Sequence, residues 1–215
     1  MESNEDILKD MSTSIEEFEK DLGLTPKFLD SLLHENDWAF IIKLSALLEL
    51  VATNILVIKF KNENIEDLLA HLDYANKKSG KIAFLQKMDV ITKEQFNVLC
   101  NFAELRNKMV HKIENTNFTF NAHISSFDKN QTKIFLGWVG LGISDYIPIN
   151  EKQITKRDFI LTYPKIAIWI TIKEIIGCVY LDKKLETYKD ALTFTIAPSL
   201  DTKTLKINEL LHKEF

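Results

Sequence analysis

Two long apolar stretches constrain the fold of this chain more than any other feature. They are LSALLELVATNILVI at residues 44–58 and IAIWITIKEIIGCVYL at residues 166–181. The first is too short to span a bilayer and contains Glu49, and the second contains Lys173 and Glu174. Both therefore predict long helices buried in a protein core, and no membrane span.

The segments around the first stretch also have helical patterns. Apolar residues recur at helical spacing from Trp38 onward, which predicts a helix over about 38–60 with Asn36 or Asp37 as its cap. Thr92 and Gln95 have the spacing of a capping box and predict a helix of about twenty residues after them. Shorter helices are expected over residues 4–21, 27–35, 64–75 and 81–91, the last with Ser79 as a candidate cap.

The character of the sequence changes between residues 114 and 154. NFTFNAHI at 117–124 alternates apolar and polar residues, which predicts a half-exposed strand. Three of the six glycines fall in GWVGLG at 137–142 and indicate an irregular or hairpin-bearing insertion. Beyond it, Thr155 could cap a final helix over 156–187, in which Pro164 is either a kink or an alternative start.

These patterns predict a mainly α protein with a β-like or irregular insertion before the last long helix. The expected parts are an N-terminal helical arm at 1–33, a helical bundle formed by 34–113 together with 155–190, the insertion at 114–154, and a C-terminal tail with a short helix at 191–215.

The charge and the N-terminus limit the partners and the location. The formal net charge is −4 and the pI is about 5.8, unlike the strong basic excess of proteins that coat DNA. The first residues, MESNEDILKD, are acidic and polar and do not resemble a signal peptide. We expect a cytoplasmic protein.

The segment ELRNKMVHKIEN, at residues 104–115, contains one of the two arginines of the chain and one of its five histidines. On a helix, Asn107 and His111 are four residues apart and share a face, whereas Arg106 lies about 140° round the axis from His111. One copy of this set is therefore an awkward active site. Two copies that face each other across a symmetric dimer would be a better one.

These residue types suit the cleavage of an RNA phosphodiester without a metal or another cofactor. His111 could take a proton from the ribose 2′-hydroxyl or give one to the leaving 5′-oxygen. The Arg106 guanidinium could stabilise the charge of the transition state, and Asn107 could bind the phosphate or orient the imidazole. Because the 2′-hydroxyl is the nucleophile, RNA is the expected substrate.

Each of these residues also has a simpler interpretation. An arginine and a histidine occur by chance at the solvated end of a helix, where a histidine complements the dipole. Glu49 is either a rim carboxylate paired with a lysine or a supporting group that faces the site. Lys108 and Lys112 flank His111 and either form part of a basic groove or lie on an ordinary solvated surface.

The run KIAFLQKMDVITKEQFNVLCNFAELRNKMVH, residues 81–111, resembles the HEPN superfamily, most closely the branch that contains the mannitol operon repressor family. The resemblance depends on the helix start at Lys81–Ile82, the helix end at 88–91 and the Leu-Arg-Asn-x-x-x-His motif from Leu105 to His111. It implies an antiparallel HEPN-like bundle of helices. It covers about half of the chain and leaves 1–33 and 114–154 without a counterpart.

The resemblance also implies a function. Many HEPN proteins are metal-independent ribonucleases, often toxins or defence effectors, whose arginine and histidine meet at a homodimer interface. It assigns Arg106 and His111 to catalysis, Asn107 to a helper role and an antitoxin or another protein as a partner. Ile113 stands where some of these toxins have a tyrosine that their antitoxin modifies. The alternative is a non-catalytic regulator similar to the mannitol operon repressor, in which the same helix serves dimerisation.

The aromatic residues of the insertion leave a further question open. Phe118, Phe120, Phe135 and Trp138 could stack on bases, or they could pack onto the core.

Overall fold

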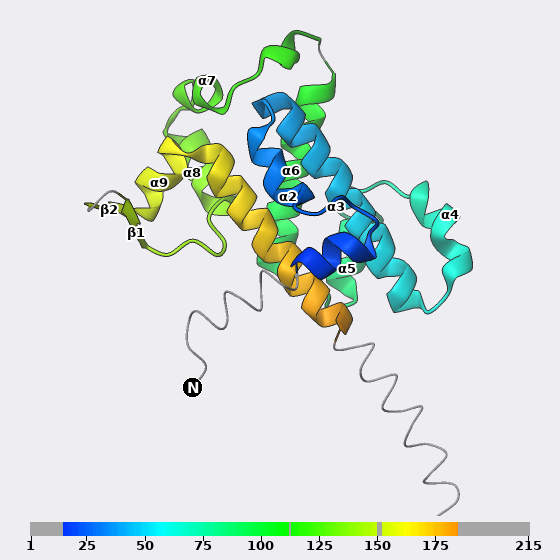
Figure 1. Ribbon diagram of the computed structural model, residues 1–215. Coiled ribbons are helices and arrows are strands. Elements are labelled where there is room, and N and C mark those ends of the chain that lie inside the picture. Colours follow the sequence, from blue (N-terminus) through cyan, green and yellow to red (C-terminus); the bar gives the residue numbers. More distant parts are fainter. Residues whose placement is uncertain (1–14, 112, 150–151, 185–215) are drawn as a thin grey trace, which may run out of the picture. The chain divides into compact units, whose positions relative to one another are not determined.

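The computed structural model describes residues 15–111, 113–149 and 152–184. The described residues up to Val179 belong to one compact unit, and those from Tyr180 onward belong to a second. The protein is mainly α, as the sequence predicts, with one two-stranded sheet in the described part (Figure 1). The short helix expected within 191–215 and the first residues of the expected helix over 4–21 lie outside the described residues.

Helix α3, Asp37–Phe60, is the central helix of the first unit. Asn36 is its cap, and the Asn36 side chain accepts a hydrogen bond of 2.8 Å from the backbone N–H of Ala39. The length and composition of α3 would allow it to cross a membrane, but 56% of its most apolar window is buried inside the protein. Helices α4, α5 and α6 all pack on it, so α3 has the position of a core helix.

Helices α5, Lys81–Lys87, and α6, Lys93–Val110, lie on one side of α3. Thr92 and Gln95 form the predicted capping box at the start of α6. The indole N–H of Trp38, at the start of α3, donates to the backbone oxygen of Met109 at the end of α6, over 3.3 Å. The two helices therefore run in opposite directions. The cap of α5 is Gly80 and not Ser79.

The helix expected over 64–75 is shorter than predicted. It consists of the 3-10 turn η2, Glu63–Ile65, and α4, Glu66–Ala70. The chain turns at Asp73, whose side-chain oxygen Oδ1 accepts from the backbone N–H groups of Ala75 and Asn76, at 2.8 and 2.6 Å. An aspartate that binds its own following backbone competes with helix formation, so the helix does not continue to residue 75.

The single helix expected over 156–187 is interrupted at its proline. Helix α9, Lys156–Thr162, begins at the cap residue Thr155, as predicted, and ends at Tyr163. A second helical segment begins at Pro164 and continues to the end of the described residues at 184. Proline lacks a backbone N–H and disfavours a helical conformation at the residue before it, so Pro164 is a start and not a kink.

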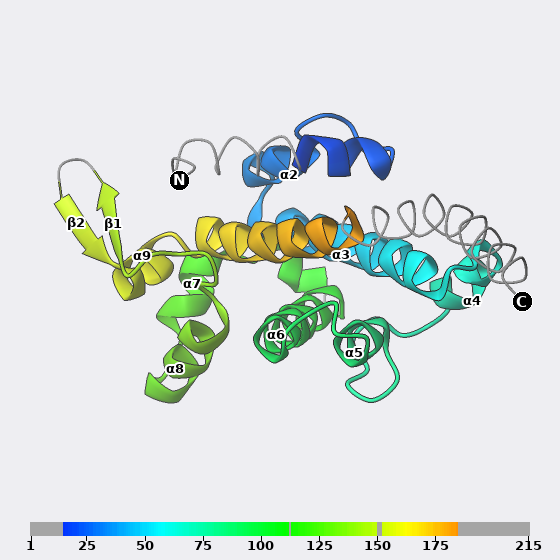
Figure 2. The ribbon, with the colours of Figure 1, turned by 90° about the horizontal axis from the view of Figure 1, so that it is seen from below.

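The helices of the first unit are arranged in layers. Figure 2 shows α3 and the helical residues 164–179 in a middle layer, with α2, Phe28–Ser31, on one side and α5 and α6 on the other. The short 3-10 helix η1, Leu32–His34, follows α2 directly. The indole N–H of Trp169 donates to the backbone oxygen of Leu29 over 2.8 Å and joins the middle layer to α2.

A buried carboxylate joins the N-terminal helix, residues 15–21, to the start of α2. The Glu19 side chain is only 2% exposed, and its two oxygens accept from the backbone N–H groups of Lys27 and Leu29 at 2.7 and 2.8 Å. Lys27 has a φ of 61° and precedes α2 as its cap, so the carboxylate satisfies amides that the short helix cannot.

We expect Glu19→Ala to lower the free energy of unfolding by about 1–3 kcal/mol, because it leaves two backbone amides without an acceptor. Urea unfolding followed by circular dichroism measures the loss. The matched control is Glu16→Ala, on the same helix at an exposed position, which should change stability by less than about 0.5 kcal/mol. Equal losses in the two variants would contradict this role of Glu19.

The insertion at 114–154 contains more helix than predicted. The strand expected over 117–124 is wrong: Thr119 caps a helix, α7, Phe120–Ser125, after the 3-10 turn η3, Ile113–Asn117. Phe118 and Phe120, the two aromatic residues of the apparent alternation, pack edge to face with ring centroids 5.2 Å apart. Asp128 and Gln131 form a second capping box and start α8, Lys129–Trp138.

A hairpin completes the insertion, in agreement with the sequence. Strands β1, Tyr146–Ile149, and β2, Lys152–Thr155, pair antiparallel, with Tyr146 opposite Thr155. Between α8 and β1, Gly140 and Gly142 have φ values of 120° and 74°, a conformation that side chains rarely allow. The backbone N–H of Gly140 donates to the hydroxyl of Thr171 over 2.9 Å and holds this loop on the last helix.

The described part of the second unit is helical and short. It covers residues 180–184, in which the ammonium groups of Lys183 and Lys184 lie 5.6 and 5.1 Å from the centre of the Tyr180 ring.

Candidate functional site

The Arg-Asn-x-x-x-His set lies at the C-terminal end of α6. Arg106 and Asn107 are in the last turns of the helix, and His111 is its C-terminal cap with helical backbone angles of −85° and −8°. A guanidinium N–H of Arg106 donates to the side-chain oxygen of Asn107 over 3.1 Å. Arg106 is half-buried, while Asn107 and His111 are exposed. The set is therefore accessible from solvent.

Arg106 and Asn107 line a cavity of about 340 Å³, which we call the Arg106 cavity. The other walls come from α3 and from the segment that follows α4. The lining residues are Ser45 and Glu49 on α3, Ala103, Arg106 and Asn107 on α6, and residues 70–75. The structure therefore brings together three of the predicted residues, Arg106, Asn107 and Glu49.

His111 and Lys108 do not line the Arg106 cavity. Arg106 and His111 are five residues apart, about 140° round an ideal helix axis, and His111 lies one turn beyond Asn107 as the cap of the helix. Lys108 lines a different cavity, on the opposite side of α6. Lys112 lies outside the described residues. In one protomer the guanidinium of the motif thus lines the Arg106 cavity and the imidazole does not.

Glu49 forms an ion pair with a lysine, and it also faces the Arg106 cavity. Its carboxylate lies 3.1 Å from the ammonium of Lys81, whose side chain is only 1% exposed. The Glu49 side chain itself is 44% exposed. The two interpretations of Glu49 that the sequence leaves open are therefore compatible, because one carboxylate can neutralise a buried ammonium and still reach the cavity.

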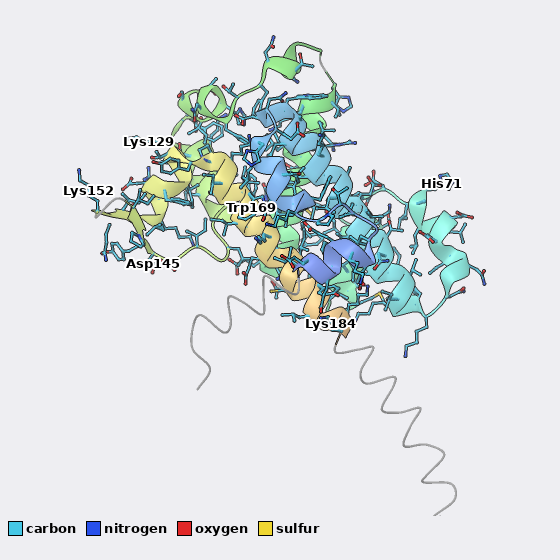
Figure 3. The ribbon with its side chains drawn as sticks, viewed as in Figure 1. His71, Lys129, Asp145, Lys152, Trp169 and Lys184 are labelled. Atoms are coloured by element: carbon cyan, nitrogen blue, oxygen red, sulfur yellow. The ribbon has the colours of Figure 1, made fainter. Side chains whose placement is uncertain are left out.

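The segment after α4 adds residues to this site that no sequence pattern predicted. His71 follows the last residue of α4 (Figure 3), and Asp73 and Tyr74 come next along the cavity wall. Burial raises the pKa of the Tyr74 phenol above its ordinary value, as do nearby Cys100 and the Glu49 carboxylate, so the phenol stays a protonated hydrogen-bond donor. No motif marks these residues in the sequence.

A tight loop explains how this segment reaches the cavity. The backbone N–H groups of Lys81 and Ile82 donate to the backbone oxygens of Asp73 and Tyr74, at 2.9 and 3.1 Å. A Cβ atom at Gly80 would lie 2.6 Å from the backbone nitrogen of Asn76, closer than real contacts allow. Only glycine fits there, so Gly80 lets residues 73–80 fold back beside α5 and hold His71 and Tyr74 near Arg106.

The Arg106 cavity combines opposite charges at its wall. It contains the guanidinium of Arg106, the carboxylates of Glu49 and Asp73, and the amide of Asn107. No group of three or more His, Cys, Asp or Glu side chains in the described ranges could hold a metal ion. A guanidinium and an amide in one polar recess can hold a phosphate group by charge-assisted hydrogen bonds.

Comparisons of the chain with protein-family models, with curated proteins and with solved structures give no match.

Proposed function

We propose that this protein is a cytoplasmic, metal-independent endoribonuclease of HEPN type that acts as a homodimer. The observation that carries the proposal is the incomplete site of one protomer: Arg106 and Asn107 line a polar cavity, while His111 is exposed at the end of the same helix. A twofold axis near this helix end would bring the His111 of one protomer to the Arg106 cavity of the other.

The proposed chemistry is an internal transesterification of RNA. The ribose 2′-oxygen attacks the neighbouring phosphorus while the bond between phosphorus and the 5′-oxygen breaks. His111 takes the 2′-hydroxyl proton or gives a proton to the leaving 5′-oxygen, and water performs the other proton transfer, so that no proton is gained or lost overall. Arg106 stabilises the additional negative charge on the phosphoryl oxygens. Asn107, held by Arg106, binds a phosphate oxygen. The products carry a 2′,3′-cyclic phosphate and a 5′-hydroxyl.

A second candidate function, a non-catalytic regulator, is supported by the same separation of Arg106 and His111 within one protomer. In that case the exposed end of α6 serves only to bind a second copy or another protein. In the nuclease case an antitoxin or another protein would be the partner that restrains the activity. The two functions differ in whether RNA is cut.

Incubation of the purified protein with mixed RNAs in EDTA tests the proposal. We expect the wild type to cut RNA and to leave 2′,3′-cyclic phosphate ends, detectable by mass spectrometry. Arg106→Ala and His111→Ala should cut at least about a hundredfold more slowly. The matched controls are Arg157→Ala, at the only other arginine of the chain, and His34→Ala, at another exposed histidine. A stable dimer that leaves all RNA intact would favour the regulator.

A further inference from the structure

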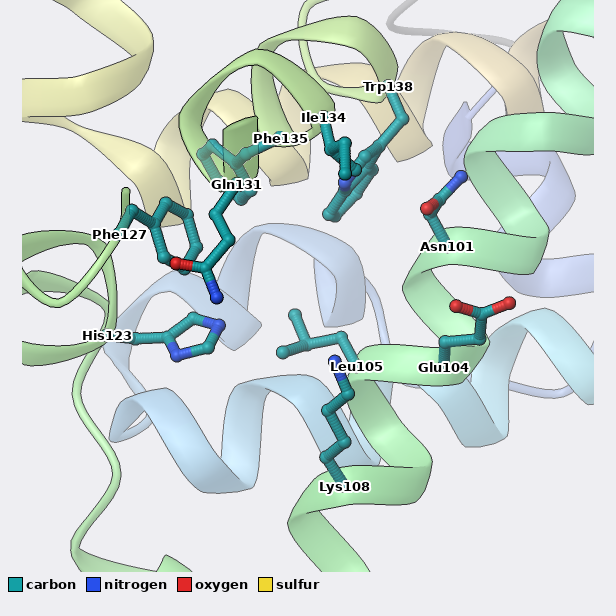
Figure 4. Close-up of a pocket in the computed structure, with 10 residues that line it drawn as sticks. All are labelled: Asn101, Glu104, Leu105, Lys108, His123, Phe127, Gln131, Ile134, Phe135 and Trp138. Carbon is teal, nitrogen blue, oxygen red and sulfur yellow. The ribbon is translucent and has the colours of Figure 1, made fainter. Parts of the chain in front are cut away.

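A second cavity lies on the other side of α6, between that helix, α7 and α8 (Figure 4). Its volume is about 270 Å³, and none of its lining residues belongs to the Arg106 cavity. We call it the aromatic cavity, because rings from α8 and from the turn before α8 form its walls. The proposed chemistry does not use it.

The walls of the aromatic cavity are apolar and held by ring contacts. Phe127 lies 4.8 Å from His123 and 5.6 Å from Phe135, and Phe135 lies 5.4 Å from Trp138, measured between ring centroids. Phe135 and Trp138 are almost fully buried, whereas Ile134 is 58% exposed. The edge-to-face contacts fix the rings in place, so a flat ligand would meet a preformed apolar wall.

Polar groups surround the apolar wall. Figure 4 shows the Gln131 amide beside the His123 imidazole, with Asn101 and Glu104 on the α6 side. Burial and the nearby Lys108 ammonium lower the pKa of His123, so its imidazole is neutral at pH 7 and can both donate and accept a hydrogen bond. Amides and a neutral imidazole can pair with the donors and acceptors on the edge of a base.

The charges at the rim suit a phosphodiester backbone. Lys108 lines the aromatic cavity from α6 and is three residues from His111, so the two side chains are neighbours along one face of the helix. The Glu104 carboxylate, which would repel phosphate, is paired with the ammonium of Lys77 at 2.9 Å. A positive group therefore lies between the aromatic cavity and the end of α6.

We infer that the aromatic cavity binds one base of single-stranded RNA, with the backbone crossing Lys108 toward His111. The inference rests on the proposed ribonuclease function for the choice of RNA. The cavity combines an aromatic wall that accepts a planar ring, polar groups that match a base edge, and a lysine toward the motif. Base stacking on aromatic side chains is the usual way in which proteins hold single strands. Of the aromatic residues that the sequence offered for stacking, only Phe135 and Trp138 line this cavity, while Phe120 packs in the core.

The test measures binding with a strand that cannot be cut. The probes are a fluorescein-labelled octanucleotide with 2′-O-methyl sugars and mixed bases, and the same strand with abasic sugars, compared by fluorescence anisotropy in EDTA. We expect the wild type to bind the strand with bases about tenfold more tightly. Ile134→Glu, at an exposed position of the cavity wall, should reduce this ratio to less than about twofold. Because both strands carry the same phosphates, the ratio removes the general repulsion by the new carboxylate.

Leu68→Glu is the matched control, since Leu68 is also an exposed aliphatic residue, 73% accessible on α4 and outside both cavities. It should keep the wild-type ratio. Two results would overturn the inference. One is equal affinity of the wild type for the two strands, and the other is an Ile134→Glu variant that still prefers the strand with bases as strongly as the wild type does. RNA that is bound with the expected ratio but never cut supports the base site and rejects the nuclease. If RNA is cut but the strands with and without bases bind equally well, the result supports the nuclease and rejects the base site.

Discussion

Equal amounts of Arg106→Ala and His111→Ala protein, allowed to exchange subunits, should recover about a quarter of the wild-type ribonuclease activity, although each variant alone is inactive. If each site takes Arg106 from one protomer and His111 from the other, a mixed dimer has one site with both residues and one with neither. Random exchange makes half of the dimers mixed, and half of the sites in these dimers are intact.

The expectation follows from where the structure places the motif. Arg106 lines a cavity that His111 does not line, and the five-residue spacing puts the two residues about 140° apart round an ideal helix axis. A site within one protomer would need His111 to reach the Arg106 cavity from the end of the same helix. A site shared between protomers needs only a twofold axis near that helix end.

Two measurements complete this experiment. The rate of cutting is followed in EDTA after subunit exchange, and the dimer fraction is determined by light scattering. The matched control is a mixture of Arg106→Ala with the double variant Arg106→Ala/His111→Ala, which cannot form an intact site and should stay inactive. No recovery in a mixture that contains mixed dimers would place both residues of a site in the same protomer and reject the shared site.

The second large effect is expected at Glu49. Glu49→Ala should lower the free energy of unfolding by about 2–4 kcal/mol, because it leaves the ammonium of Lys81 buried without its carboxylate. The Lys81 side chain is 1% exposed and its ammonium lies 3.1 Å from Glu49. The half-exposed position of Glu49 keeps the expected loss below that of a fully buried pair. Urea unfolding of purified variants measures it.

The double variant Glu49→Ala/Lys81→Met distinguishes a lost charge partner from lost packing. With no charge left to bury, it should recover most of the stability that Glu49→Ala loses. Lys43→Ala breaks the exposed ion pair with Glu35 and should cost less than about 1 kcal/mol. If the double variant is no more stable than Glu49→Ala, the Lys81 ammonium is not the origin of the loss.

Local signals in the sequence predicted the helices well where capping and apolar periodicity agreed. Asn36, Thr92 and Thr155 all cap the helices expected after them, and α3 is buried as its composition suggested. Local signals were misleading where the same few residues fitted both a strand pattern and a helix cap. The alternation at 117–124 fitted a strand, yet Thr119 caps a helix there, and strand periodicity over a few residues is weak without a partner strand.

Only part of the candidate site could be predicted from the sequence. The spacing within one helix shows that Asn107 and His111 share a face, and the charge of Glu49 marked it as unusual in an apolar stretch. Nothing local shows that His71 and Tyr74 would lie beside Arg106, because the fold-back at Gly80 that brings them there depends on contacts with α5.

The sequence alone therefore determined the mainly α fold, the helix starts and the residues of the Arg106 motif, since these depend on periodicity and on caps within a few positions. Only the tertiary structure decided which of them meet. It placed Glu49 and the segment 70–75 with Arg106 around one cavity, left His111 outside that cavity and formed the aromatic cavity on the other side of α6. Such proximity depends on how helices distant in the chain pack together, and local spacing carries no information about that packing.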